Sequence, residues 1–275
     1  MKSQDSNREG ITFRGIRFEF DSGAGFDISL YPSMEGSRSV SAFGADPIST
    51  SAVVTVADQK RCNCYSFDGF APHLHGTHTE TRQHIVREPR PVAEILTTFR
   101  FIAKLVSLDI ERADPAVHSL TVGGDSIVTR EALERKLSGD QTAPEMLIIR
   151  TPNFVGKRTM HYGGTNPPYP HHAIGALCVE RGIEHIILDL PSADREEGQL
   201  YFHRTFWRDP VDGNGGVIPE LRHISGPTRE KATITELAFI DDGVPDGWYL
   251  CHLIPIGFPG DAAPVRPIIT PLQMV

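Results

Sequence analysis

Two short apolar runs constrain the fold of this chain more than any other feature. The runs, "EMLIIRT" at 145–151 and "EHIILDL" at 184–190, lack the polar alternation of half-exposed strands, so each is predicted to be a strand buried on both faces. A helix is predicted between them, from Pro170, which suits a first helical position, to Arg181, with Gly182 as its stop. Strand, helix and strand in succession indicate a layered fold of sheet and helices.

The rest of the chain adds further strands and one clearer helix. The segment "SIVTREALERKLSG" at 126–139 has Thr129 as a candidate N-cap and places Leu133 and Leu137 on one helical face. Short β-rich runs fill the first and last quarters of the chain. Both α/β and α+β arrangements fit this pattern. We predict the α/β class, a mixed sheet flanked by helices, in one domain over 1–275 with residues 1–10 flexible.

Charge and composition exclude some partners. The chain has 27 basic and 35 acidic residues, a net charge of −8, and no dense Lys/Arg run, so nucleic acid is not expected as a partner. No segment approaches the roughly 18 apolar residues of a membrane span, and the polar start lacks a signal-peptide pattern. We therefore expect no membrane partner and a cytoplasmic location. The four cysteines are expected to be reduced thiols; a lone C-x-C pair, Cys62 and Cys64, is only a weak metal pattern.

The candidate chemistry is concentrated at residues 73–85, "HLHGTHTETRQHI". A single histidine is usually a surface or hydrogen-bonded core residue, but several imidazoles beside a carboxylate repel one another when protonated, so a metal or proton-transfer site explains the cluster better. On a strand His78 and Glu80 share one face, and Gly76 allows close backbone approach. Imidazole and carboxylate ligands suit zinc, manganese, cobalt or iron. The histidines of this segment are His73, His75, His78 and His84.

The run Gly76–His84, "GTHTETRQH", resembles the G-T-H-x-D-x-P-x-H core of the cyclase family of metal-dependent hydrolases, which includes bacterial kynurenine formamidases and isatin hydrolases. Further segments resemble the family in the same order along the chain: "FDISL", "MLIIRT", "ILDLPSAD", "YFHRTFW", "ITEL" and "PVRPII". The resemblance implies a β/β/α architecture of the swivelling type. It also implies a small-molecule substrate and a homodimer or homotetramer.

The resemblance assigns roles to individual residues. It implies one or two divalent ions, zinc or manganese, and His84 as the residue that transfers protons. The implied metal ligands are His78, Glu80, His203 and Glu236. The polar residues that follow the buried strand at 184–190 are expected to orient ligand histidines by hydrogen bonds, with a cap between strand and loop as the alternative. These residues are Asp189, Ser192 and Asp194.

Three positions depart from the family pattern. The family's first histidine falls at Leu74, between His73 and His75, and we favour His73 as the fifth ligand, which in a regular strand requires a bulge. Glu80 replaces an aspartate, which leaves one ion or two open. Arg82 replaces a proline, so the pocket wall can carry a charge.

The predicted activity is hydrolysis of a C–N amide bond by metal-activated water, with N-formylkynurenine as the first candidate substrate and another aryl or cyclic amide as the next. The alternatives are a non-catalytic binding protein of the same fold and a metal-dependent lyase or isomerase. His171 and His172 are expected to be a solvent-facing or capping pair, although the preceding loop can line a pocket. Core packing is preferred to a substrate wall for the aromatic residues Tyr169, Phe206 and Trp207.

Overall fold

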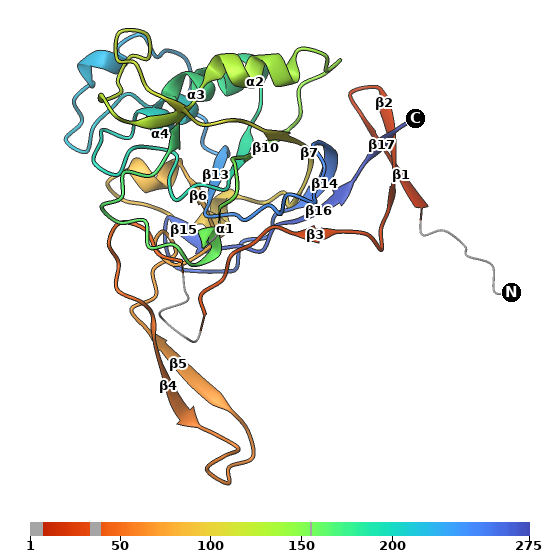
Figure 1. Cartoon of the computed structure of the whole chain (residues 1–275), viewed down its shortest axis with the longest axis vertical. Helices are drawn as coiled ribbons and strands as arrows, with labels where there is room; N and C mark the ends of the chain where they lie inside the picture. The colour runs from red at the N-terminus through yellow and green to blue at the C-terminus, as the bar shows by residue number, and fades with distance from the viewer. Residues whose placement is uncertain (1–7, 34–39, 155) are drawn as a thin grey trace, which may run out of the picture.

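The computed structural model describes residues 8–33, 40–154 and 156–275. Its centre is a nine-stranded sheet with the order β15-β6-β13-β12-β10-β7-β14-β16-β3 (Figure 1). The four middle strands are parallel to one another. They are β7 (Arg100–Ser107), β10 (Met146–Arg150), β12 (His185–Leu188) and β13 (Thr233–Glu236). Both apolar runs that opened the sequence analysis are thus central strands, β10 and β12.

Antiparallel strands extend this centre on both sides. On one side lie β14 (Gly247–His252), β16 (Ile268–Pro271) and β3 (Phe26–Asp27). On the other side β6 (His78–Thr81) pairs with β13, and β15 (Ala262–Pro264) pairs with β6 at the sheet edge. The strand that carries the histidine motif is therefore held between a central strand and the edge strand.

Each face of the sheet has its own core, because successive strand residues point to opposite faces. Leu147 and Ile149 pack with the helical face, whereas Met146 and Ile148 pack on the other face against β14 and the segments around Ile28 and Ile240. Three helices cover the helical face: α2 (Arg130–Leu137), α3 (His172–Arg181) and α4 (Tyr201–Trp207). A short α1 (Val92–Ile95) lies near β6 and β15.

Smaller elements surround this body. A three-stranded sheet joins the two ends of the described chain, β1 (Arg8–Phe13), β2 (Ile16–Asp21) and β17 (Gln273–Met274). Another contains β8 (Glu111–Arg112), β9 (Ser126–Val128) and β11 (Tyr169–Pro170). The 3-10 turns are η2 (Arg82–Ile85), η3 (Lys157–Thr159) and η4 (Pro219–Leu221). The hairpin of β4 (Ser49–Val54) and β5 (Cys64–Asp68), here called the arm, projects away from the body (Figure 1).

The predicted α/β class with a mixed sheet is confirmed. The helix expected from Pro170 begins at His172, because Pro170 is the last residue of β11 and pairs with Val128. Of the leader expected to be flexible, residues 1–7 lie outside the described ranges, whereas Arg8–Gly10 begin β1 and pair with β2. None of the helices in the described ranges is long and apolar enough to cross a membrane.

All four cysteines are free; Cys62 precedes β5 and Cys64 begins it.

Candidate metal centre

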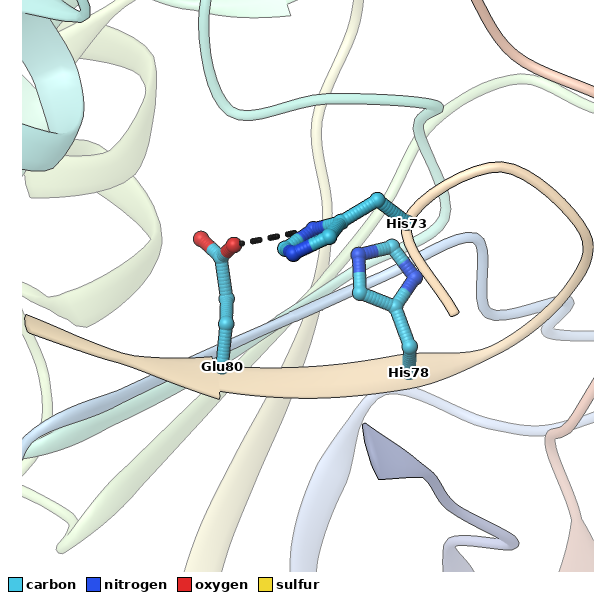
Figure 2. A group of neighbouring side chains, drawn as sticks. All are labelled: His73, His78 and Glu80. Carbon is cyan, nitrogen blue, oxygen red and sulfur yellow. Dashed lines mark ion pairs between the residues drawn. The ribbon is translucent and has the colours of Figure 1, made fainter. Parts of the chain in front are cut away.

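Strand β6 delivers the first two residues of the site. His78 and Glu80 are both fully buried and rise from the same face of β6, as their spacing of two requires (Figure 2). The antiparallel partner strand β13 places Glu236 directly opposite His78. Gly76 has a φ of +141°, and a side chain there would meet the Leu30 carbonyl oxygen at 2.8 Å, so the approach to β6 requires glycine.

Helix α4 delivers His203. The Asp194 carboxylate accepts hydrogen bonds from the backbone N–H groups of Phe202 and His203, and so caps the start of the helix. The same carboxylate accepts a hydrogen bond from Nδ1 of His203 at 2.6 Å. Because Nδ1 is occupied, Nε2 of His203 is the nitrogen that faces Glu80, at 2.7 Å from Oε1.

The site atoms approach one another without hydrogen-bonding. Nε2 of His78 lies 3.4 Å from Oε2 of Glu236, and Nε2 of His203 lies 3.5 Å from Oε1 of Glu236. In the described chain, Nε2 of His78, Nε2 of His203 and both Glu80 oxygens are buried and have no hydrogen-bond partner. Ligands about 2.1 Å from a tetrahedral ion lie about 3.4 Å apart, so these separations and unpartnered atoms fit a divalent ion with nitrogen and oxygen ligands.

His73, not His75, faces this centre. Nδ1 of His73 lies 3.3 Å from Oε2 of Glu80, and its ring is 5.0 Å from the His78 ring (Figure 2). The predicted bulge is not needed, because residues 72–74 form a turn before β6. His75 is buried among backbone groups instead: Nε2 lies 2.9 Å from the Asp46 carbonyl oxygen, and Nδ1 accepts from the N–H of Ala71.

Burial and opposite charges set the electrostatics of the centre. Burial disfavours the imidazolium form, but Glu236 and Glu80 raise the pKa of His78, and mainly Glu80 and Asp194 raise the pKa of His203. Burial also disfavours carboxylates, yet His84 and His203 lower the pKa of Glu80, and His203 and His78 lower the pKa of Glu236. Both carboxyls are therefore ionised at neutral pH, the form that ligates cations.

His84 lies at the open side of the centre. It belongs to the η2 turn directly after β6, where Thr81 caps the turn by accepting from the N–H of Gln83. Its Nδ1 is 2.8 Å from Oδ2 of Asp261 and 3.5 Å from Oε2 of Glu80. Three triplets of these side chains bring ligand atoms close enough to share an ion: His73–His78–Glu80, His73–His84–Asp261 and Glu80–His84–His203.

A known protein family matches the part of the chain that carries His73, His78, Glu80 and His84. The family model described as "Putative cyclase" matches residues 27–195, more than half of the chain. The chain belongs to the cyclase family. Among curated proteins no sequence match was found.

Solved structures share the cyclase fold over most of the chain. Isatin hydrolase A from Labrenzia aggregata, bound to benzyl benzoate, matches with a TM-score of 0.60 and 17% identity, covering 92% of this chain and 96% of that one. A predicted metal-dependent hydrolase from Bacillus stearothermophilus matches with a TM-score of 0.56 and 14% identity, covering 90% and 98%. A structure described as a novel cyclase has a TM-score of 0.59 and 15% identity, covering 91% and 89%.

The three polar residues after β12 divide between the two roles considered for them. Asp194 orients His203, but the Asp189 carboxylate contacts no histidine of the centre: it accepts from Lys157 Nζ at 2.7 Å and from the N–H of Thr151. Asp189 therefore does not orient a ligand histidine; it forms an ion pair with the buried Lys157 of the η3 turn. Ser192 caps the loop by accepting from the N–H of Asp194. A backbone group adds a contact not foreseen: Ala193 N–H donates to Oε1 of Glu236 at 2.6 Å.

Arg82, at the family's proline position, points away from the centre. Its guanidinium donates to Asp209 at 2.7 Å and to Glu230 at 2.6 Å. Asp209 follows α4 and Glu230 precedes β13, so Arg82 connects the η2 turn to the segments that carry His203 and Glu236. The charge predicted for the pocket wall is thus paired within the protein.

The remaining candidates lie outside the centre. Phe206 and Trp207 are fully buried in the core on the helical face, as expected for core packing. His171 and His172 line a separate cavity of about 560 Å³ together with Tyr169 and Asp194. Asp194 lies between that cavity and the centre, because its carboxylate accepts a hydrogen bond from Nδ1 of His203.

Asp261 is the residue that sequence reasoning missed. It lies directly before β15, whose pairing with β6 sets Ala262 opposite Glu80 and so carries Asp261 to the side of the motif. Hydrogen bonds from His73 and His84 hold the pKa of Asp261 well below its usual range. An aspartate between glycine and alanine in a loop is too weak a signal to identify from sequence.

Proposed function

We propose that this cyclase-family protein is a metal-dependent hydrolase that cleaves a C–N amide bond in a small aryl or cyclic amide. The observation that carries the proposal is the set of buried, unpartnered nitrogen and oxygen atoms that converge from β6 and α4. The isatin hydrolases among the similar structures support an amide or lactam substrate class. N-formylkynurenine and isatin are therefore the first compounds to assay.

The residues that would hold the ion are His73, His78, Glu80, His203 and Glu236, and their donor set suits zinc or manganese. A bound divalent ion supplies polarisation of the substrate carbonyl and a more acidic water. His84 is the group placed to move protons, because its side chain is 26% exposed at the mouth of the centre and can exchange protons with solvent. It would accept a proton from the attacking water and donate it to the leaving nitrogen.

The test combines elemental analysis with turnover of N-formylkynurenine and isatin. We expect at least one ion per chain, and a loss of turnover of about 10²–10⁴-fold in His84→Gln with ion content unchanged. His171→Gln is the matched control and should retain both ion and activity. Absence of any bound ion, even after reconstitution with zinc or manganese, would overturn the proposal. Failure to incorporate ¹⁸O from labelled water into product would indicate a lyase or isomerase instead.

We also propose that the protein forms a homodimer through the arm. Isolated two-stranded hairpins are marginally stable in water, and the arm strands pack chiefly on each other. The chain also carries an apolar cavity of about 440 Å³ at the base of the arm, lined in part by Leu30, Tyr31, Phe70 and Pro72. Because each chain carries both an arm and a cavity, two chains related by a two-fold axis could each place the arm in the cavity of the other. The exposed apolar side chains of the arm are Val53, Val56, Tyr65 and Phe67.

Exposure of the arm can be measured by thiol labelling, because Cys62 and Cys64 in the arm are exposed whereas Cys178 and Cys251 are buried. We expect light scattering to give a dimer, and Phe67→Ser to shift it to monomer and speed labelling of Cys62 and Cys64. A wild-type monomer with fast labelling would contradict this arrangement. The four free thiols also support a reducing compartment, for which we propose the cytoplasm.

A further inference from the structure

One oxygen of Asp261 serves two histidines of the centre. Its Oδ2 is 2.9 Å from Nε2 of His73 and 2.8 Å from Nδ1 of His84. The centroids of the two imidazole rings lie 4.4 Å apart. His73 comes from the turn before β6 and His84 from the turn after it, so Asp261 joins both ends of the motif.

The contacts of Asp261 differ in kind from those inside the centre. Both meet the geometry of hydrogen bonds, whereas Nδ1 of His73 stands 3.3 Å from Glu80 and Nε2 of His78 stands 3.4 Å from Glu236, the longer spacing of atoms around an ion. The shorter contact inside the centre, 2.7 Å between Nε2 of His203 and Oε1 of Glu80, does not have the geometry of a hydrogen bond. Asp261 therefore accepts a hydrogen bond from each of the two imidazoles.

Each inward-facing histidine has an oxygen acceptor on its outer nitrogen. Nδ1 of His78 lies 3.0 Å from the Gly76 carbonyl oxygen, and Nδ1 of His203 lies 2.6 Å from Asp194. Asp261 has the same role for His73: it accepts a hydrogen bond from Nε2–H, which leaves the lone pair on Nδ1 facing Glu80. Outer acceptors of this kind fix the tautomer and ring orientation of metal-bound histidines.

The same oxygen fixes the tautomer of His84. When Nδ1 carries the proton and donates a hydrogen bond to Asp261, Nε2 is left as the basic nitrogen. We propose that Asp261 is a positioning residue for two functions at once: it orients His73 as a ligand and sets His84 as the proton carrier. This inference rests on the proposed function and extends it, because ion affinity and proton transfer then depend on one carboxylate.

The experiment compares Asp261→Ala and Asp261→Asn with the wild type, using Asp109→Asn, at an exposed aspartate, as the control. Zinc affinity is measured by competition with a chelator, and kcat and KM on the substrate found active above. For Asp261→Ala we expect zinc affinity to fall about 10- to 100-fold and kcat to fall with little change in KM. Asp261→Asn, which keeps one acceptor oxygen, should recover part of both losses.

Two outcomes would overturn the inference. The first is wild-type zinc affinity together with wild-type kcat in Asp261→Ala. The second is a loss of one whole ion per chain, from two to one, with the affinity of the remaining ion unchanged, which would make Asp261 a ligand of a second ion. Zinc affinity is measured without substrate, so it tests the hold on His73 even if no amide is hydrolysed. Circular dichroism melting of each variant separates these results from unfolding.

Discussion

The chain contains two clusters of histidines that look alike in composition and differ in their surroundings. In the β6 cluster (His73, His78, His84 and His203) the inner nitrogens face carboxylates, whereas in the α3 cluster (His118, His171 and His172) they meet backbone and hydroxyl groups. Burial and neighbouring imidazoles lower the pKa of His171 and His172, the opposite of His78 and His203. A density of imidazoles therefore does not define a site; opposed carboxylates do.

The largest effect is expected when a carboxylate is removed from the β6 cluster. Glu80→Gln takes away the negative charge that faces His73 and His203, and with it the carboxylate that would bind the ion. We expect loss of bound ion and a fall in turnover of at least about 10³-fold, several kcal/mol of transition-state stabilisation. Elemental analysis and steady-state kinetics measure both. Retention of the ion in Glu80→Gln would remove the basis of the contrast.

The next effect concerns the outer acceptor of His203. Asp194→Asn keeps the shape of the cap on α4 but weakens the hydrogen bond to Nδ1, so we expect ion affinity to fall about 10- to 100-fold. Titration with a chelator gives the affinity. His171→Gln serves as the comparison from the α3 cluster, and equal losses in the two variants would argue against a distinct role for Asp194.

His75 lies in the motif but outside the centre, so it should affect stability and not ion binding. His75→Leu would leave the Asp46 carbonyl and the Ala71 N–H without their present partners, at a cost of about 1–2 kcal/mol in the free energy of unfolding. Ion content should not change. Urea unfolding and elemental analysis on the same sample separate the two; loss of the ion without loss of stability would place His75 among the ligands.

The smallest effect is a pH dependence of stability in the α3 cluster. Burial, with His171 and His223 nearby, lowers the pKa of His172 from 6.5 to about 4. Between these values the unfolded chain binds a proton that the folded chain does not, so the free energy of unfolding falls as pH falls from 6.5 towards 4. From pH 7 to pH 5 the wild type should lose about 1–2 kcal/mol more than His172→Gln. Parallel urea-unfolding profiles for the two proteins would contradict this.

The features that could be predicted from the sequence are those that depend on the local pattern of residues along one strand. The spacing of two residues put His78 and Glu80 on one face of a strand, and the unbroken apolar runs identified β10 and β12. His203 and Glu236 were reached only through the resemblance to the family, because their meeting with β6 depends on sheet order. Asp189 shows the limit: like Asp194 it follows β12, but its partner is Lys157, which only the tertiary structure reveals.

The edge position of β15 has a consequence for how an ion enters and leaves. This strand has three residues and pairs within the sheet only with β6, so it should open locally at a lower cost than the central strands. Opening would carry Asp261 away and release His73 and His84, while β13 still holds β6 with His78 and Glu80 in register. Fraying of this edge would open a route for ion exchange, and we expect amide hydrogens of β15 to exchange faster than those of β13.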